Sequence, residues 1–514
     1  MEKKNNYVNK NIINIILAGI SIAIGFLFIY INLFQYKYGL NADIASEGLL
    51  AKIIWNSKEW IPDEWYGSTE TRVLSLTHVA ALFYGITEDI CLSMGLSSIV
   101  GMVLVLLGAY GLCKELELNV TQKCWFLLLI LILPNNKNQI ELMHIFAGHY
   151  AIHISVYLYA MIYYLKILKG VSVKKIYLFI LSGCFFLLGM QGARALLMIT
   201  GPMLAAEGIR IGYQICCNRK MARTEIISIA YVISLNIAAF LGGKMPTSVG
   251  YALSRNIRKA PQKFIGTVLP DFLNTLDWKG ISAIEKIVFL GLICLTLWQA
   301  VRILMKGIKK QELKLEEIVF MNFGISVSLT IAALTFTTVD SSSRYFVIIF
   351  LTMAIAFVIT WKQRGKILKS VIAFSIIIIL IGNTCRVYYP MIIDKSYVNN
   401  TYQKIGEFLI QEGYENAYTN FDHANTITVI NDDKVQVSAV SSFSSMEISK
   451  WLTSKNWYVP SIPMNSKTAY IVSDYRLEEF KEFLEKHRDT VKFEVRIGEF
   501  NIYGSEYNYS KLTD

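Results

Sequence analysis

The chain has 514 residues, of which 54% are hydrophobic and 17% are charged, whereas about a quarter of the residues in a soluble protein carry charge. This composition excludes an ordinary soluble enzyme and indicates a protein that lies mostly within a membrane. The net charge of +11 does not indicate nucleic-acid binding, because the basic residues fall in short clusters between apolar runs, as membrane topology requires. The eight cysteines lack the paired spacing of a zinc site.

The first apolar run, residues 12–33, follows a basic leader and is too long for a signal peptide, so we expect a retained transmembrane helix. Windows of about 20 apolar residues, the length that crosses a bilayer, predict further spans. These lie near residues 91–113, 124–133, 150–165, 176–190, 193–209, 226–241, 284–304, 318–336, 345–361 and 367–388. The sequence therefore predicts a mainly α-helical, polytopic transmembrane bundle of about 11 spans.

Lysine and arginine gather in alternate loops, for example in residues 114–123, 166–175 and 302–310. The positive-inside rule places these loops, and the N-terminus with them, in the cytoplasm. We expect the membrane that the chain crosses repeatedly to be the plasma membrane. The odd number of spans then places the segment after the last span outside. The longest of the opposite loops is residues 34–90, and function is to be sought on that side.

After the last predicted span the composition changes abruptly. Polar and apolar residues alternate, which predicts strands at 426–430, 434–440, 469–472 and 491–497 and a helix at 476–487. We therefore expect two domains, a membrane module of residues 1–390 and an extracytoplasmic α/β domain of residues 391–514. Substrate docking, or covering of the membrane site, would suit the second domain.

Asp43 and Glu47 stand one helical turn apart near the start of the first outer loop. The apolar spacing around them predicts a helix on the membrane surface that carries both carboxylates on one face. One interpretation is a solvated helix face with Asp43 as its cap. The alternative is functional, because a carboxylate just outside the bilayer is well placed to deprotonate an acceptor hydroxyl or to bind a divalent cation.

His149 and His153 lie where the third and fourth predicted spans meet outside. They are four residues apart, so on a continuous helix they share a face, as metal ligands or phosphate partners would. The spacing fixes no third ligand, and packing in a polar pocket is the alternative. Asp43, Glu47, His149 and His153 are thus the candidate ligands of a divalent cation, Mg²⁺ or Mn²⁺, and His149 is the better candidate for contact with phosphate.

Two arginines lie at outer helix ends, where the positive-inside rule disfavours them. Arg194 follows Gln191 in the tight turn between the fifth and sixth predicted spans, and Arg344 precedes Tyr345 at the start of the tenth. A guanidinium offers a fork of donors that matches phosphate oxygens, and it would neutralise a departing lipid phosphate. Pairing with a headgroup phosphate is the alternative for either arginine alone, whereas two on the same side favour a substrate role.

The first outer loop resembles the first half of the GT-C glycosyltransferases, which are polytopic enzymes that use polyprenyl-phosphate-linked sugars. The Arg344-Tyr345 pair near the final spans is similar to a recurrent feature of the same superfamily. The resemblance implies that Asp43 is the catalytic base. The segments that carry it are Asp43 after the first span, Glu59-Trp60-Ile61-Pro62, Trp65-Tyr66-Gly67 and Phe83-Tyr84-Gly85-Ile86-Thr87.

This resemblance implies a bacterial-type membrane glycosyltransferase that moves a sugar from a polyprenyl-phosphate donor to an extracytoplasmic acceptor, which is a glycan, a lipid or a protein. The alternatives are a cell-surface polysaccharide polymerase and a flippase or transporter of lipid or oligosaccharide. A transporter should carry charges deep within its spans and repeated halves. The candidate substrate-binding residues, beside the base Asp43, are Glu47, His149, Arg194, Arg344 and Tyr345.

Overall fold

The computed structural model describes residues 2–68, 70–146, 148–216, 221–245, 254, 257–363, 366–394 and 400–510. Its contacts divide the chain into two compact units. The first unit comprises Met1–Ile29 and Ile99–Tyr389, and the second comprises Tyr30–Ser98 and Pro390–Asp514. The division near residue 390 falls within the last long apolar segment, Phe374–Ile393, and the contacts also group Tyr30–Ser98, hereafter the first outer segment, with the tail.

The first unit is built of helices, and α4 (Ile90–Glu115) begins in the second unit and ends in the first. Its other helices are α1 (Glu2–Tyr30), α5 (Val120–Ile132), α6 (Lys137–Ile140), α7 (Ala151–Leu168), α8 (Lys175–Met190), η3 (Leu196–Thr200), α9 (Gly201–Cys216), α10 (Arg223–Gly242), α11 (Ala260–Lys263), η4 (Phe264–Val268), α12 (Leu269–Thr275), α13 (Ala283–Ile308), α14 (Leu315–Phe336), η5 (Ser343–Phe346), α15 (Ile348–Gln363), α16 (Lys366–Asn383) and η6 (Thr384–Tyr388).

Among the described residues, 8 helical segments are long and apolar enough to cross a membrane. Large apolar side chains such as Ile15, Phe26, Ile287 and Leu304 lie exposed along them, as expected of surfaces that lipid covers. The chain is therefore a multi-pass membrane protein. The other predicted spans coincide with the shorter helices α5 and α8 and with η3 followed by α9, so the total number of spans stays a prediction. The long segments are Ile12–Gly39, Ile90–Glu115, Ala151–Leu168, Arg223–Gly242, Ala283–Ile308, Leu315–Phe336, Ser343–Trp361 and Phe374–Ile393.

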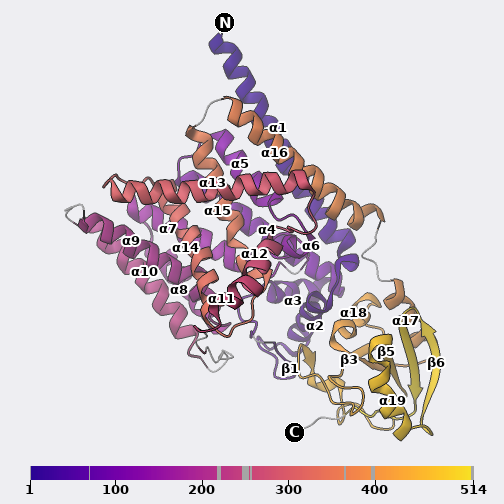
Figure 1. Ribbon diagram of the computed structural model, residues 1–514. Coiled ribbons are helices and arrows are strands. Elements are labelled where there is room, and N and C mark those ends of the chain that lie inside the picture. Colours follow the sequence, from indigo (N-terminus) through magenta and orange to yellow (C-terminus); the bar gives the residue numbers. More distant parts are fainter. Residues whose placement is uncertain are drawn as a thin grey trace. The chain divides into compact units, whose positions relative to one another are not determined.

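Helices α8 and α10 run side by side with their backbones in close approach (Figure 1). A Cβ atom on Gly189 of α8 would lie 2.1 Å from the carbonyl oxygen of Ala239. A Cβ atom on Gly242 of α10 would lie 2.0 Å from that of Phe186. Only glycine permits such approach, which is common between helices in membranes. The short helix α8 is thus held by direct backbone packing against its neighbour.

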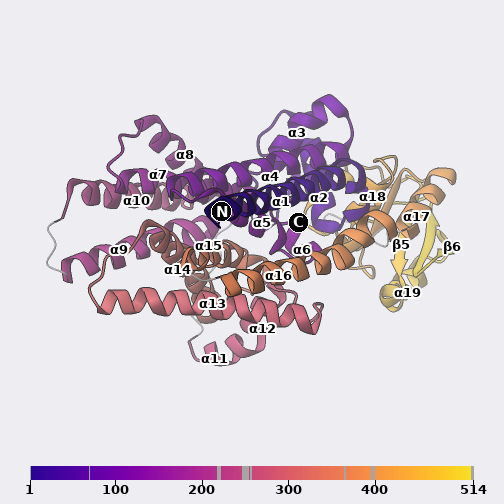
Figure 2. The ribbon, with the colours of Figure 1, turned by 90° about the horizontal axis from the view of Figure 1, so that it is seen from above.

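Buried carboxylates on the helices of the first unit are paired with cations. Arg386 of η6 donates through Nη1 to both carboxylate oxygens of Glu285 on α13, at 2.7 and 2.6 Å. This pair joins α13 to the helix that continues α16, and Figure 2 shows α13 and α16 lying along one another. Glu207 accepts in the same way from Arg210, at 2.8 Å from Nε. An unpaired buried charge is costly, so stability of the fold is sufficient to explain why an arginine stands beside each of these carboxylates.

The tail forms a five-stranded sheet in the order β3-β2-β5-β7-β6, of which the first three strands are parallel and the last two antiparallel. Helices α17 and α18 pack on one face of the sheet and α19 on the other (Figure 1). The predicted α/β region after the membrane bundle is confirmed. Its elements are α17 (Asn400–Gln411), β2 (Asn416–Thr419), α18 (Phe421–Ile430), β3 (Gln436–Ala439), β5 (Thr468–Ser473), η9 (Asp474–Arg476), α19 (Leu477–Lys486), β6 (Val491–Ile497) and β7 (Phe500–Ser505).

The predicted strand at residues 426–430 is wrong, because this segment belongs to helix α18. Its β-branched residues favour a strand by propensity alone. In the structure Ile427 packs into the core against the sheet, and Val429 packs with Ala45 and Leu49 of the first outer segment. Burial on two sides outweighs the local preference. The strands predicted at 434–440, 469–472 and 491–497 and the helix at 476–487 correspond to β3, β5, β6 and α19.

Helix α2 (Ala42–Ser57) begins at Asn41, whose side chain accepts a hydrogen bond of 2.9 Å from the backbone N–H of Ile44. It packs against α3 (Leu76–Thr87) and against α18 of the tail. Asn425 of α18 donates through Nδ2 to Ser46 Oγ and to the carbonyl oxygen of Leu452, at 2.9 Å each. The helix expected on the membrane surface is therefore largely covered by protein.

A two-stranded antiparallel sheet also ties the first outer segment to the tail, by pairing β1 (Trp65–Tyr66) with β4 (Thr453–Ser454). Next to it, the backbone N–H of Lys455 donates to the carbonyl oxygen of Glu64 at 2.7 Å. The two segments form one folded body despite their separation in sequence. The remaining short helices of this unit are η1 (Ile31–Gln35), η2 (Tyr36–Gly39), η7 (Pro390–Asp394) and η8 (Lys455–Trp457).

The predicted orientation is testable with single cysteines at two exposed lysines, Lys481 on α19 and Lys309 after α13. In intact cells without a wall, a membrane-impermeant maleimide should label Lys481→Cys, and it should label Lys309→Cys only after permeabilisation, since basic loops stay inside. The unmodified protein measures the background from the native cysteines. If intact cells label Lys309→Cys and do not label Lys481→Cys, the protein has the opposite orientation.

Candidate active site

Asp43 lies in the first turn of α2 with its side chain exposed, and the residues that follow, Ile44 and Ala45, are buried. Because Asn41 caps the helix, Asp43 is not the cap, and that interpretation is wrong. Asn41 and the buried residues hold this end of the helix in place. The side chain of Asp43 is thus presented at the surface of the second unit by a capped helix.

Glu47 is one turn away from Asp43 but is only 5% exposed. Arg72 donates through Nε to Glu47 Oε1 at 2.7 Å, and the hydroxyl of Thr77 donates to Oε2. Arg72 also binds Glu70, at 3.1 Å between Nη1 and Oε2. Burial would lower the pKa of Arg72, but the two carboxylates outweigh it and raise that pKa above its usual value. These contacts give Glu47 a positioning role, while its contact with substrate stays a prediction.

In the first unit, the guanidinium groups of Arg194 and Arg344 both lie near the ring of Tyr345. The guanidinium carbon of Arg194 is 4.4 Å from the ring centroid of Tyr150 and 5.9 Å from that of Tyr345. The guanidinium carbon of Arg344 is also 5.9 Å from the ring of Tyr345. Aromatic faces attract cations and orient them. The structure therefore brings together three predicted site residues, and it adds Tyr150, which no sequence pattern indicated.

The turn that carries Arg344 is held by contacts from three other segments. Thr275 donates through its hydroxyl to the carbonyl oxygen of Ser343 at 2.9 Å, and Gln139 Nε2 lies 3.3 Å from Ser343 Oγ. Lys263 donates through Nζ to the carbonyl oxygen of Thr337 at 2.7 Å, just before the turn. Sequence reasoning missed these supporting residues, because hydrogen bonds to a distant backbone leave no local pattern.

The two candidate histidines do not share a helix. Helix α7 begins at Ala151, so His149 lies in the preceding turn, whereas His153 is buried on α7 itself. The condition for a shared face, one continuous helix through both residues, is therefore not met. Among the residues that the structure describes, no group of three or more His, Cys, Asp or Glu side chains is arranged to hold a metal ion. The cation ligands remain a prediction, and no step below depends on a cation.

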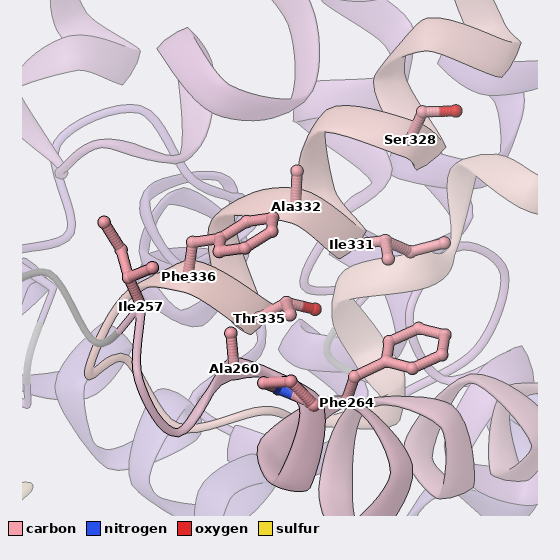
Figure 3. Close-up of a pocket in the computed structure, with 9 residues that line it drawn as sticks. Ile257, Ala260, Phe264, Ser328, Ile331, Ala332, Thr335 and Phe336 are labelled. Carbon is pink, nitrogen blue, oxygen red and sulfur yellow. The ribbon is translucent and has the colours of Figure 1, made fainter.

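An apolar pocket of about 450 Å³ opens in the first unit between α14 and the segment of α11 and η4 (Figure 3). Its walls include Phe264, Ile331, Ala332 and Phe336. Ile331 also packs on the same buried cluster as Tyr345. The pocket therefore lies next to the turn that carries the two predicted site residues of this region, and its lining suits an apolar chain.

Comparisons with known proteins support the same architecture. No protein-family model matches the sequence, and no curated protein matches it either. ArnT from Cupriavidus metallidurans in the apo state superposes with a TM-score of 0.58 at 10% identity, over 95% of this chain and 97% of that one. ArnT bound to undecaprenyl phosphate gives a TM-score of 0.52 at 10% identity over the same shares of the chains.

The apo oligosaccharyltransferase of Archaeoglobus fulgidus also resembles the chain, with a TM-score of 0.50 at 11% identity over 93% of this chain and 69% of that one. At such identities the likeness concerns the fold. The superposition covers most of this chain, including the membrane helices and the sheet region of the tail. The chain has the fold of ArnT and of this archaeal oligosaccharyltransferase, which agrees with the fold that the resemblance to the GT-C glycosyltransferases implies.

Proposed function

We propose that the chain is a glycosyltransferase that moves a sugar from a polyprenyl-phosphate donor to an acceptor outside the cytoplasm. The observation that carries the proposal is the pair Arg194 and Arg344 around Tyr345, with an apolar pocket beside it. Such a combination suits a molecule with an anionic head and a long apolar tail. ArnT, which has the same fold, has been solved with undecaprenyl phosphate, a molecule of this class.

The apolar pocket would hold part of the isoprenoid tail. Ile331, Ala332 and Phe336 offer it hydrocarbon contacts, and burial of apolar surface contributes about 25 cal/mol per Å². The phosphate would then lie with the arginines, whose orientation the rings of Tyr150 and Tyr345 maintain. A tail that remains in an apolar environment while the phosphate meets cations keeps the donor at the membrane boundary.

In the proposed reaction the oxygen of an acceptor hydroxyl attacks the anomeric carbon of the donor sugar. The bond from that carbon to the phosphate oxygen breaks, and its electron pair leaves with the phosphate. Asp43 accepts the hydroxyl proton, and Arg194 and Arg344 stabilise the charge that develops on the leaving phosphate. One base and one stabilised leaving group are sufficient for such a transfer.

A polysaccharide polymerase would use the same donor chemistry, and only the identity of its product separates it from other transferases. A flippase or transporter is less well supported. Its expected signature is charge deep within the spans, but Glu285 lies in the first turn of α13, and both Glu285 and Glu207 form ion pairs with arginines. These pairs account for the charges through packing, so the described helices give no specific reason to prefer transport.

Asp43→Asn tests the proposed base. Asparagine has nearly the same size but cannot accept the proton, so the variant should insert normally and lose activity by roughly a hundredfold or more. The measurement is consumption of a labelled polyprenyl-phosphate sugar by membranes, together with the surface glycan profile of cells that make the protein. Asp422→Asn is the matched control, because Asp422 is also an exposed aspartate in a first helical turn of the same unit. Wild-type turnover by Asp43→Asn would show that Asp43 is not the base.

Arg194→Ala and Arg344→Ala test the phosphate role. Each should leave the protein in the membrane in near-normal amount but lower turnover by roughly a hundredfold, as loss of one preorganised donor at a developing charge does. Arg496→Ala is the control, since Arg496 forms an exposed ion pair with Asp474 in the tail, at 2.7 Å. If both variants consume the lipid-linked donor at the wild-type rate, the arginines do not act on its phosphate.

A further inference from the structure

A second pocket, of about 110 Å³, lies within the second unit between α2 and the loop of residues 60–72. Trp60, Trp65, Glu70 and Arg72 contribute to its walls, and Leu452 of the tail closes one side. The volume holds several water molecules and is too small for a whole lipid or peptide. Two indole rings combined with a carboxylate and a guanidinium make this lining unlike that of the apolar pocket.

Trp60 is 58% exposed, yet its ring is fixed. Its Nε1–H donates to the carbonyl oxygen of Val73 at 2.8 Å, and one face of the indole stacks on His78 with 4.2 Å between ring centroids. His78 in turn donates through Nε2 to the carbonyl oxygen of Trp60 at 3.0 Å. Burial lowers the pKa of His78, which keeps the imidazole neutral in this stack. The exposed indole is therefore a preorganised platform, which loses little entropy when a ligand covers it.

The polar groups of the pocket are also held in place. Arg72 is bound by Glu47 and Glu70, so its planar guanidinium and the Glu70 carboxylate have defined directions. The indole Nε1 of Trp65 is buried without a hydrogen-bond partner among the described residues.

A sugar ring has the matching chemistry, because its C–H faces are apolar and its edge carries hydroxyl groups that donate and accept. One face would stack on Trp60 while the hydroxyls bond to Glu70 and Arg72. The surrounding charge restricts the kind of sugar. Glu70 on the pocket wall and Glu47 behind it outnumber Arg72, while on the rim the exposed carboxylates of Glu59 and Asp63 are accompanied by the exposed lysines Lys58 and Lys455. An acidic sugar would be repelled, whereas a neutral or amine-bearing sugar would not.

An exposed tryptophan near a membrane also serves as an anchor in the headgroup layer. The surroundings of Trp60 favour the sugar, because charged side chains line the pocket beside it and its ring is fixed at a single orientation. We propose that the pocket formed by Trp60, Trp65, Glu70 and Arg72 is a sugar-binding subsite that accepts neutral or amino sugars and rejects acidic ones. This inference rests on the proposed function and names the substrate class that the same protein handles.

The test uses the full chain in nanodiscs and methyl glycosides of neutral, amino and uronic sugars, with saturation-transfer NMR as the readout. Neutral or amino glycosides should receive saturation from the protein, and the uronic glycosides should not. Trp60→Ala should remove the signal, and Trp60→Phe, which retains an aromatic face, should keep part of it. Phe493→Ala is the matched control, because Phe493 is an exposed aromatic residue on β6 away from the pocket. Equal signals from uronic glycosides, or signals that do not depend on Trp60, would overturn the proposal.

Two further measurements separate this inference from its alternatives. In the transfer assay, Trp60→Ala should raise KM for the sugar-bearing substrate about tenfold and leave kcat near wild type, as loss of uniform binding does. If the Trp60→Ala variant keeps the wild-type KM and the wild-type glycoside signal, the subsite is wrong and the proposed function still stands. If glycosides bind through Trp60 but no sugar is transferred from a lipid-linked donor, the subsite stands and the proposed function is wrong. Quenching of Trp60 by bromine-labelled lipid chains, measured against Trp60→Phe, would show a membrane anchor and overturn the subsite.

Discussion

The geometry of the second unit depends on one buried carboxylate. Glu47 lies inside the protein on α2, and a charge in that place needs a cation and hydrogen-bond donors. Arg72 supplies the cation from the end of the first outer loop, and Thr77 supplies a hydroxyl from α3. The loop must therefore return to α2 at this point. That return sets the position of the loop residues relative to the helix whose first turn presents Asp43.

Local patterns were sufficient for much of the fold. Hydropathy is a property of short windows, so the long spans and the change to an α/β tail follow from the sequence. The segment 426–430 failed because its state is decided by neighbours on both sides, one of them in the first outer segment. The pairing of helix and loop through Glu47 and Arg72 was likewise not predictable. By spacing, Asp43 and Glu47 are equivalent carboxylates, and only tertiary contacts make one exposed and the other buried.

The candidate site shows the same division. Arg194 and Arg344 can each be selected as candidates from their own segment, because an arginine at a predicted outer helix end opposes the usual distribution of basic residues. Arg344 adjoins Tyr345 in the chain, whereas the approach of Arg194 to the ring of Tyr345 is a property of helix packing and has no signal in either segment. The fixed stack of Trp60 on His78 is similar, since its residues belong to a loop and a helix that hydropathy treats as unrelated.

The strand pair between β1 and β4 has a consequence for the biogenesis of the protein. The hydrogen bond nearby between Ser46 and Asn425 joins residues 379 positions apart, so the partner of the first outer segment is synthesised after the whole membrane bundle. Until the tail has been synthesised and folded, β1 lacks its pairing strand and α2 lacks the cover of α18. A chain that stops before β4 is thus incomplete in two places, and the first outer segment reaches its final fold only after the tail has been made.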